Sequence, residues 1–171
     1  AIDGVGYGDD GTVWGSEIFS GQVPDLKRVA HLEPVAMPGG DLATRFPERM
    51  LYGILPDKKI LALLGKRGWS DIELGVLEQQ MVRGFNVMNT TSTGRVLDAV
   101  SALLGICRER TYDGEPAMKL ESAAAGGRIE EWELGFSTRN GCEQLSSRSL
   151  VRQALLQKEA APDGNERVIR D

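Results

Sequence analysis

The spacing of apolar residues predicts strands in the first part of the chain. From Thr12 to Phe19 apolar and polar residues alternate enough for a strand, and residues 26–32 form a plausible partner. Because Pro24 lies between these segments, we expect them to pair as a hairpin. Ala1–Asp3 reads as the end of a buried strand, with no initiating methionine before it, which predicts that the chain was cut from something larger.

Helical spacing begins after a turn predicted over residues 37–40. Asp41 is expected to cap a helix that runs to Leu51, with a break near Phe46 because Pro47 lies inside the run.

Two further helices are predicted before the middle of the chain. Residues 60–64 fit a short helix that ends at Gly65 and Gly68. Ser70 is expected to cap an amphipathic helix that stops at Gly84.

The second half mixes loops, helices and one strand. Residues 86–94 predict a loop of small hydroxyl and amide side chains that leads into a helix with its apolar stripe over residues 96–106. Residues 111–116 predict a turn before another helix. Partial alternation predicts a strand over residues 129–136, and residues 146–159 are expected to be helical. Together, these strands and helices predict a mixed α/β fold.

Composition narrows the class of protein. The chain has 171 residues, 41% hydrophobic and 26% charged, which suits one domain with a proper core. A net charge of −5 and no basic run argue against a nucleic-acid-binding face. No apolar run reaches the length of a membrane span, so we expect no membrane partner and a cytoplasmic location. Cys107 and Cys142 lie far apart, and we interpret both as buried thiols.

Candidate chemistry is concentrated near the N-terminus. Asp3 is followed by Gly4, Gly6, Gly8 and Gly11, and glycines this dense let backbone N–H groups approach an anion such as a phosphate or acyl phosphate. The same residues fit a β-hairpin turning at residues 9–11. Both interpretations stay open on the local pattern.

Two titratable residues need separate interpretation. His31 is the only histidine, and since a metal site needs several ligands we interpret it as structural. No complete metal site and no histidine-based nucleophilic triad are predicted in this chain. Asp98 lies beside the apolar stripe of its helix, in what we expect to be the first turn, where a carboxylate complements the helix dipole.

Four segments resemble, in order, signature segments of the carbamoyltransferase HypF family of hydrogenase maturation proteins. They are DGVGYGDDGTVWGSE (3–17), HLEPVAMPGGDLATRFPERM (31–50), TSTGRVLDAVSALLGI (91–106) and YDGEPAMKLE (112–121). The resemblance implies a partial domain of the actin, sugar-kinase and Hsp70 type, ribonuclease H-like, with a mainly helical insertion. Residues 1–160 would then be a fragment of the C-terminal carbamoyltransferase domain, and residues 161–171 a flexible tail.

The same resemblance implies an activity for the whole protein. A carbamoyl group would pass from carbamoyl phosphate, through a carbamoyl-adenylate made with ATP, to the C-terminal cysteine of the partner HypE, where it becomes the cyanide ligand of nickel-iron hydrogenase. The family also uses a metal ion, and the histidine-rich motif and the later acidic ligand that hold it have no match in this chain. We therefore expect the isolated chain to be inactive.

The resemblance also implies a site. Asp3, Gly4, Gly6 and Tyr7 would form one wall of the adenylate pocket, and Asp98 and Gly114 the facing wall. In related tRNA-modifying enzymes, an aspartate at the position of Asp98 contacts the adenylate ribose or substrate. Gly114 matches a glycine that lines the nucleotide. Glu115 departs from the family pattern, so no ligand contact is assigned to its side chain.

Two other functions remain open at this point. One is an O-carbamoyltransferase of the same superfamily that acts on a small-molecule hydroxyl. The other is a non-catalytic binding module. Because a partial domain leaves strand edges and apolar surface uncovered, we also expect self-association.

Overall fold

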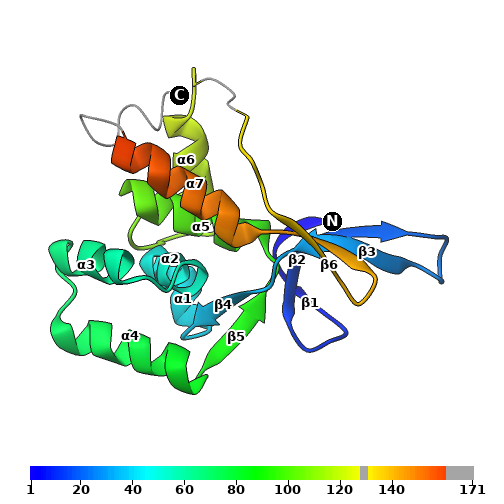
Figure 1. The fold of residues 1–171 in the computed structure, drawn as a ribbon, viewed down its shortest axis with the longest axis horizontal. Helices are drawn as coiled ribbons and strands as arrows, with labels where there is room; N and C mark the ends of the chain where they lie inside the picture. Colours follow the sequence, from blue (N-terminus) through cyan, green and yellow to red (C-terminus); the bar gives the residue numbers. More distant parts are fainter. Residues whose placement is uncertain (128–130, 161–171) are drawn as a thin grey trace.

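The computed structural model describes residues 1–127 and 131–160 and shows a seven-stranded mixed sheet with helices gathered at one end (Figure 1). The strands are β1 (Ile2–Tyr7), β2 (Val13–Ser20), β3 (Lys27–Leu32), β4 (Val35–Pro38), β5 (Val87–Thr90), β6 (Phe136–Arg139) and β7 (Cys142–Leu145). The helices are α1 (Asp41–Arg45), α2 (Pro47–Ile54), α3 (Lys58–Lys66), α4 (Asp71–Arg83), α5 (Thr93–Leu104), α6 (Glu115–Ala123) and α7 (Ser147–Ala160). The predicted mixed α/β class is confirmed.

Strand β2 is the centre of the sheet. The strand order is β4-β5-β2-β3-β7-β6, and β1 pairs with β2 outside this path. The predicted hairpin is confirmed, because β2 and β3 pair antiparallel with Glu17 opposite His31. Parallel pairing of β2 with β5 places Val13 opposite Thr90. The chain that enters α5 therefore lies beside the N-terminal glycine-rich segment.

The glycine-rich segment is a hairpin in this structure. The expected burial of the strand at Ala1–Asp3 is wrong, because Ile2 is 85% exposed. The strand also does not end at Asp3 but continues to Tyr7 and pairs antiparallel with β2, with Tyr7 opposite Val13. Glycine allows this chain reversal, since Gly11 has a φ of 75°. The hairpin interpretation is thus confirmed as a conformation, and it leaves ligand binding by the same backbone untested.

The predicted turn over residues 37–40 is only half right. Val35–Pro38 forms β4, which pairs antiparallel with β5, and the turn is confined to Gly39 and Gly40. The expected cap by Asp41 is wrong. Gly40 is the N-cap and makes no side-chain hydrogen bond, while Asp41 is the first helical residue.

The expected break near Phe46 is confirmed. Helix α1 ends at Arg45, and α2 begins at Pro47, whose fixed φ and missing N–H suit a first helical position. Helix α2 supplies much of the core and packs against α5.

Helices α3 and α4 lie next to each other at the edge of the molecule (Figure 1). The short helix is longer than predicted, because Asp57 caps it before Lys58. Ser70 caps α4 in a full capping box with Glu73, and Gly84 ends the helix in the left-handed conformation, as predicted. The expected apolar face is largely exposed, however, and Leu77 is the buried residue of α4.

Two corrections concern the remaining strands. The loop predicted over residues 86–94 contains β5, although its end does meet the N-terminus of α5 at Ser92. The strand predicted over residues 129–136 is wrong for its described part, residues 131–135. The strand there begins at Phe136 and turns back into β7. Ile129 and the tail predicted over residues 161–171 lie outside the described residues.

The hydrophobic core lies between the helices and β2, β4 and β5. Its fully buried large side chains are Val35, Met50, Leu51, Ile54, Ile60, Leu64, Leu77, Leu103 and Val151. The predicted C-terminal helix is confirmed as α7, which packs on α5 and α2. None of the helices in the described part of the chain has the length and hydropathy needed to cross a membrane.

Candidate nucleotide site

The turn of the glycine-rich hairpin is organised by one carboxylate. Asp10 Oδ1 accepts hydrogen bonds from the Thr12 backbone N–H (3.0 Å), the Thr12 hydroxyl (2.6 Å) and the Trp14 indole (3.0 Å). Partial burial opposes ionisation of Asp10, but these bonds and nearby Arg28 lower its pKa from the ordinary value. The turn is therefore fixed in shape by side chains of β2 and β3.

A close junction joins β1, β2 and the start of α5. A Cβ on Gly15 would lie 2.5 Å from the Asp3 carbonyl oxygen and 2.8 Å from the Ser92 Cβ, so only glycine fits there. Likewise, a Cβ on Gly94 would lie 3.0 Å from the Gly4 Cα. Ser92 caps α5 through the Arg95 N–H, and its hydroxyl also contacts the carbonyl oxygens of Asp3 (3.0 Å) and Gly4 (2.8 Å). We name these residues, Asp3, Gly4, Gly15, Ser92 and Gly94, the glycine junction.

The predicted wall from Asp3 to Tyr7 is only partly at this junction. Asp3 lies there with an exposed carboxylate that accepts hydrogen bonds from the N–H groups of Gly4 (2.6 Å) and Val5 (3.4 Å). Gly6 lies further along β1, against the Trp14 carbonyl, and Tyr7 is 96% exposed at the strand end. Asp3 and Gly4 are thus brought to the N-terminus of α5, whereas Gly6 and Tyr7 are not.

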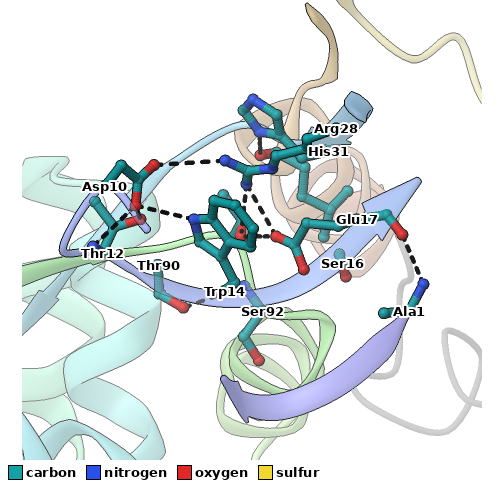
Figure 2. Close-up of polar contacts among 12 residues, drawn as sticks. Ala1, Asp10, Thr12, Trp14, Ser16, Glu17, Arg28, His31, Thr90 and Ser92 are labelled. Carbon is teal, nitrogen blue, oxygen red and sulfur yellow. Dashed lines mark hydrogen bonds and ion pairs between the residues drawn. The ribbon is translucent and has the colours of Figure 1, made fainter. Parts of the chain in front are cut away.

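A charge cluster around the buried Glu17 carboxylate, which sequence reasoning missed, ties the hairpin to the segment before α5 (Figure 2). The Arg28 guanidinium lies 4.0 Å from the Trp14 ring centroid and donates to Glu17 Oε1 at 2.9 Å. It also reaches the Thr91 hydroxyl at 3.3 Å and Asp10 at 3.5 Å. Glu17 is buried and accepts a hydrogen bond from Thr91. The sequence did hold a signal for this cluster: Glu17 and Arg28 are opposite charges on two strands expected to pair, and Trp14 lies on the same strand as Glu17.

Asp98 is not a first-turn helix charge. Helix α5 begins at Thr93, so Asp98 lies in the second turn, where it is buried and pairs with Arg95 at 2.9 Å. Burial raises the pKa of Asp98 to about 6, although Arg95 and then Arg110 act to lower it. The interpretation as a complement to the helix dipole is therefore wrong, and the carboxylate is a buried, charge-paired group.

Gly114 lies where α6 begins, next to α5. It is the N-cap of α6 with a φ of 78°, a conformation that favours glycine. The Glu115 carboxylate accepts hydrogen bonds from Thr111 and pairs with Lys119, which supports a structural role for this side chain. In the segment just before α6, Arg110 pairs with Asp113 at 3.1 Å.

The two predicted walls meet different parts of one helix. Helix α5 contacts β1 through its N-cap and packs against α6 further along. Within residues 1–127 and 131–160, no hydrogen bond or ion pair joins Asp3 or Gly4 to Asp98 or Gly114. Asp3 and Gly4 of one wall thus lie at the N-terminus of α5, whereas the other wall has Asp98 on α5 itself and Gly114 at the start of α6.

Among the described residues, no three His, Cys, Asp or Glu side chains gather as a metal site would require. The His31 Nδ1 lies 2.7 Å from the Leu32 carbonyl oxygen and its Nε2 lies 3.3 Å from the Gln144 amide, as a structural histidine would. Cys107 is a buried free thiol, whereas Cys142 is only half-buried, so the second prediction is wrong in part.

A hollow of about 550 Å³ lies apart from all predicted site residues. It is lined by residues of α2, α4 and neighbouring segments, among them Phe46, Trp69, Ile72 and Arg108.

Comparisons with known proteins assign the family. Residues 1–170 match the family described as carbamoyltransferase, Kae1-like domain, second subdomain. The chain is 48% identical over 128 residues to the probable carbamoyltransferase HypF of Methanocaldococcus jannaschii, covering 72% of this chain and 17% of that protein. It is 42% identical over 125 residues to carbamoyltransferase HypF of Rhodobacter capsulatus, covering 72% and 17%.

Solved structures agree with the sequence relatives. A crystal structure of full-length HypF in a phosphate- and nucleotide-bound form has a TM-score of 0.86 and 28% identity, and the match covers 99% of this chain and 22% of that one. The HypF structure from T. kodakarensis has a TM-score of 0.82 and 34% identity, with 99% and 23% covered. The predicted fold class is confirmed, and the chain spans about a fifth of the length of these proteins.

Proposed function

This chain belongs to the carbamoyltransferase HypF family, and from that premise we propose that it is one part of a carbamoyltransferase, in which it contributes to the nucleotide site. The support is threefold: the family match, the relatives named as carbamoyltransferases, and one related structure described as phosphate- and nucleotide-bound. The resemblance suggests the finer chemistry. Carbamoyl phosphate and ATP would yield a carbamoyl-adenylate, and the acceptor would be the C-terminal cysteine thiol of HypE during cyanide ligand synthesis in the cytoplasm.

The glycine junction is the observation that carries this proposal. In this junction the N-terminus of α5, which is the positive end of the helix dipole, lies beside three glycines, Gly4, Gly15 and Gly94. Helix N-termini and glycine-lined backbone both favour phosphate groups. An adenylate bound here would direct its phosphate to the N–H groups at the start of α5 and a hydroxyl donor to the exposed Asp3 carboxylate, while Asp98 and Gly114 further along α5 and α6 would contact the nucleoside.

The transfer step itself asks two things of the protein. A thiolate attacks the carbamoyl carbon, so negative charge develops on the carbonyl oxygen, and preorganised N–H donors stabilise that charge. In this proposal the Thr93 and Gly94 N–H groups at the start of α5 supply such donors, since the Arg95 N–H is bonded to Ser92. We propose that the metal ion of the family is held mainly by residues that this chain does not contain.

Reconstitution tests the function directly. The full-length protein is incubated with HypE, ATP and carbamoyl phosphate, and the C-terminal peptide of HypE is followed by mass spectrometry. Carbamoylation of the cysteine is expected, and HypE that lacks this cysteine is the control. Carbamoylation only of a small-molecule hydroxyl would contradict the HypE assignment and favour an O-carbamoyltransferase.

The isolated chain is expected to be inactive in the same assay. Catalysis needs metal, both nucleotide walls and acceptor positioned together, and loss of one part of a preorganised site commonly costs orders of magnitude in rate. ATP-dependent carbamoylation of HypE by this chain alone would contradict the expectation.

A further inference from the structure

Helix α5 carries a buried ion pair whose polar atoms are incompletely satisfied. Arg95 and Asp98 are 4% and 2% exposed, and Arg95 Nε lies 2.9 Å from Asp98 Oδ2. Residues three apart on a helix share a face, which explains the contact. Burying two charges costs desolvation free energy that their attraction does not reliably recover, so stability alone is a weak reason for this pair.

The pair is also short of hydrogen bonds. Arg95 Nε and Nη1 and Asp98 Oδ2 are buried without a well-directed hydrogen bond to any group in the described residues. Unsatisfied buried donors are costly and rare in native proteins. A partner outside the described chain, such as a ligand or a bound water, would therefore complete the set.

The charged side chains around Asp98 come from α5, α6 and the segment between them. Arg95 precedes it on α5, and the segment before α6 brings Arg110, which is itself paired with Asp113. Helix α6 contributes Glu115 and Lys119, which pair with each other at 2.7 Å, and the neutral Cys107 thiol lies nearby. Arg95 is the cation in direct contact with the carboxylate, and Arg110 acts from further away.

Burial and Arg95 act on Asp98 in opposite directions. Burial favours the protonated carboxyl, and Arg95 favours the charged form. A protonated carboxyl loses the charge that makes it a strong acceptor for a hydroxyl donor. Removal of Arg95 would thus weaken Asp98 as an acceptor near neutral pH.

We propose that Arg95 is a positioning residue for Asp98: its guanidinium orients the buried carboxylate and keeps it charged, so that Asp98 accepts a hydrogen bond from a hydroxyl of the bound nucleotide. This inference rests on the proposed function, which places Asp98 in the nucleotide site. It adds a role for Arg95 that is exerted through Asp98.

Calorimetric binding of ATP to the full-length protein, from pH 5 to 8.5, tests the role. Affinity of the wild-type protein should fall as the pH drops through about 6, because Asp98 becomes protonated. Asp98→Asn supplies the reference profile, since it retains the titration of the nucleotide itself. Arg95→Met should bind at least about tenfold more weakly at pH 7, and its midpoint should move to higher pH. Arg95→Lys keeps the charge and should restore the midpoint in part.

A matched control separates positioning from stability. Arg67 also pairs with a buried carboxylate, Glu48 at 3.3 Å, and it contacts α5 at the carbonyl oxygens of Ala102 and Leu103, at the opposite end of the helix from the glycine junction. Arg67→Met should lower the melting temperature and leave both the ATP affinity and the pH midpoint unchanged. Thermal unfolding of each variant confirms that binding is measured on folded protein, and if Arg95→Met does not fold, the shift in Arg95→Lys decides.

Failures of the two proposals look different. One outcome is that Asp98→Asn binds ATP more weakly while the Arg95 variants keep the wild-type affinity and pH midpoint. This outcome would overturn the positioning role and leave the nucleotide site intact. Wild-type affinity in Asp98→Asn would overturn the positioning role together with the place of Asp98 in the nucleotide site, while the reconstitution assay tests the carbamoyltransferase function separately.

Discussion

Single residues at the glycine junction decide how closely three elements approach. Gly15 has backbone of β1 on one side and the Ser92 side chain on the other, with no room for a methyl group. Gly75, in α4, has nothing within 4 Å of the position a Cβ would occupy. The same substitution should therefore have opposite effects at these two positions.

Gly15→Ala should lower the free energy of unfolding by about 1–3 kcal/mol, because the added methyl group forces β1 away from α5. Gly75→Ala should raise it by up to about 1 kcal/mol, since alanine restricts the unfolded chain and favours helix. Urea unfolding of both variants measures the difference. A Gly15→Ala protein as stable as wild type would show that the junction is looser than described.

Asp98 shows what a sequence reveals about a single residue and what it leaves out. The helical stripe correctly placed Asp98 near the buried face of α5. Its place in the first turn was wrong, because the helix begins at Thr93 and sequence patterns fix helix ends poorly. The charge cluster of Arg28, Glu17 and Thr91 was missed. These residues come from β3, β2 and the end of β5, and only the pairing of these strands in the sheet brings them together.

At the scale of elements, capping decides where helices begin. Ser70 and Glu73 form a reciprocal capping box in which the Glu73 carboxylate lies 2.8 Å from the Ser70 N–H. These hydrogen bonds lower the pKa of Glu73. Helix α4 packs little of its surface into the core, so its start depends on this cap.

Ser70→Ala should lower the unfolding free energy by about 1 kcal/mol, because an orphan N–H of the first turn loses its acceptor. Ser122→Ala, an exposed serine near the end of α6, should change it by less than about 0.5 kcal/mol. Urea denaturation compares the two. An equal loss in both variants would mean that the cap contributes nothing.

Elements with local signals were predicted, and elements defined by distant partners were not. The hairpin of β2 and β3, the break at Pro47 and the caps of α4 all follow from neighbouring residues. Strands β4, β5, β6 and β7 have four residues each, too few for alternation to be distinctive. Their pairing with one another and with β2 and β3 makes them strands.

At the scale of the whole molecule, apolar side chains lie on the surface of the strand end. Ile2, Tyr7, Ile18, Val23 and Phe136 are each more than half exposed. Among the described strands, β1 pairs with β2 alone, and Ser92 contacts the carbonyl oxygens of Asp3 and Gly4. Exposed edges and apolar patches favour association.

The isolated chain should therefore form dimers or larger species at high concentration. Light scattering measures this, and Ile18→Lys with Val23→Lys should shift the protein toward monomer. Val82→Lys, which changes an exposed apolar residue of α4, is the control and should still associate. A strict monomer at crystallisation-like concentrations would argue against the prediction.

The whole fold was predictable as a class through four family-like segments, whereas the arrangement of the site was not. Those segments became β1–β2, β3–α2, α5 and α6, and helix α5 contacts both predicted walls. Sequence spacing says nothing of the distance between Asp3 and Asp98, because that distance depends on the packing of α5 against the sheet.

The most direct test of the central claim is the nucleotide affinity of Asp3→Asn and Asp98→Asn in the full-length protein, measured together with thermal unfolding. Each variant should bind ATP at least about tenfold more weakly, because a charge-assisted hydrogen bond is lost on each wall. The melting temperature of Asp3→Asn should equal that of wild type, because Asp3 is exposed. The melting temperature of Asp98→Asn should fall, because the substitution leaves the buried Arg95 guanidinium without its charged partner. Asp71→Asn in α4 is the control and should bind as wild type does. Unchanged affinity in both variants would contradict the account and leave the glycine junction and α5 as scaffold alone.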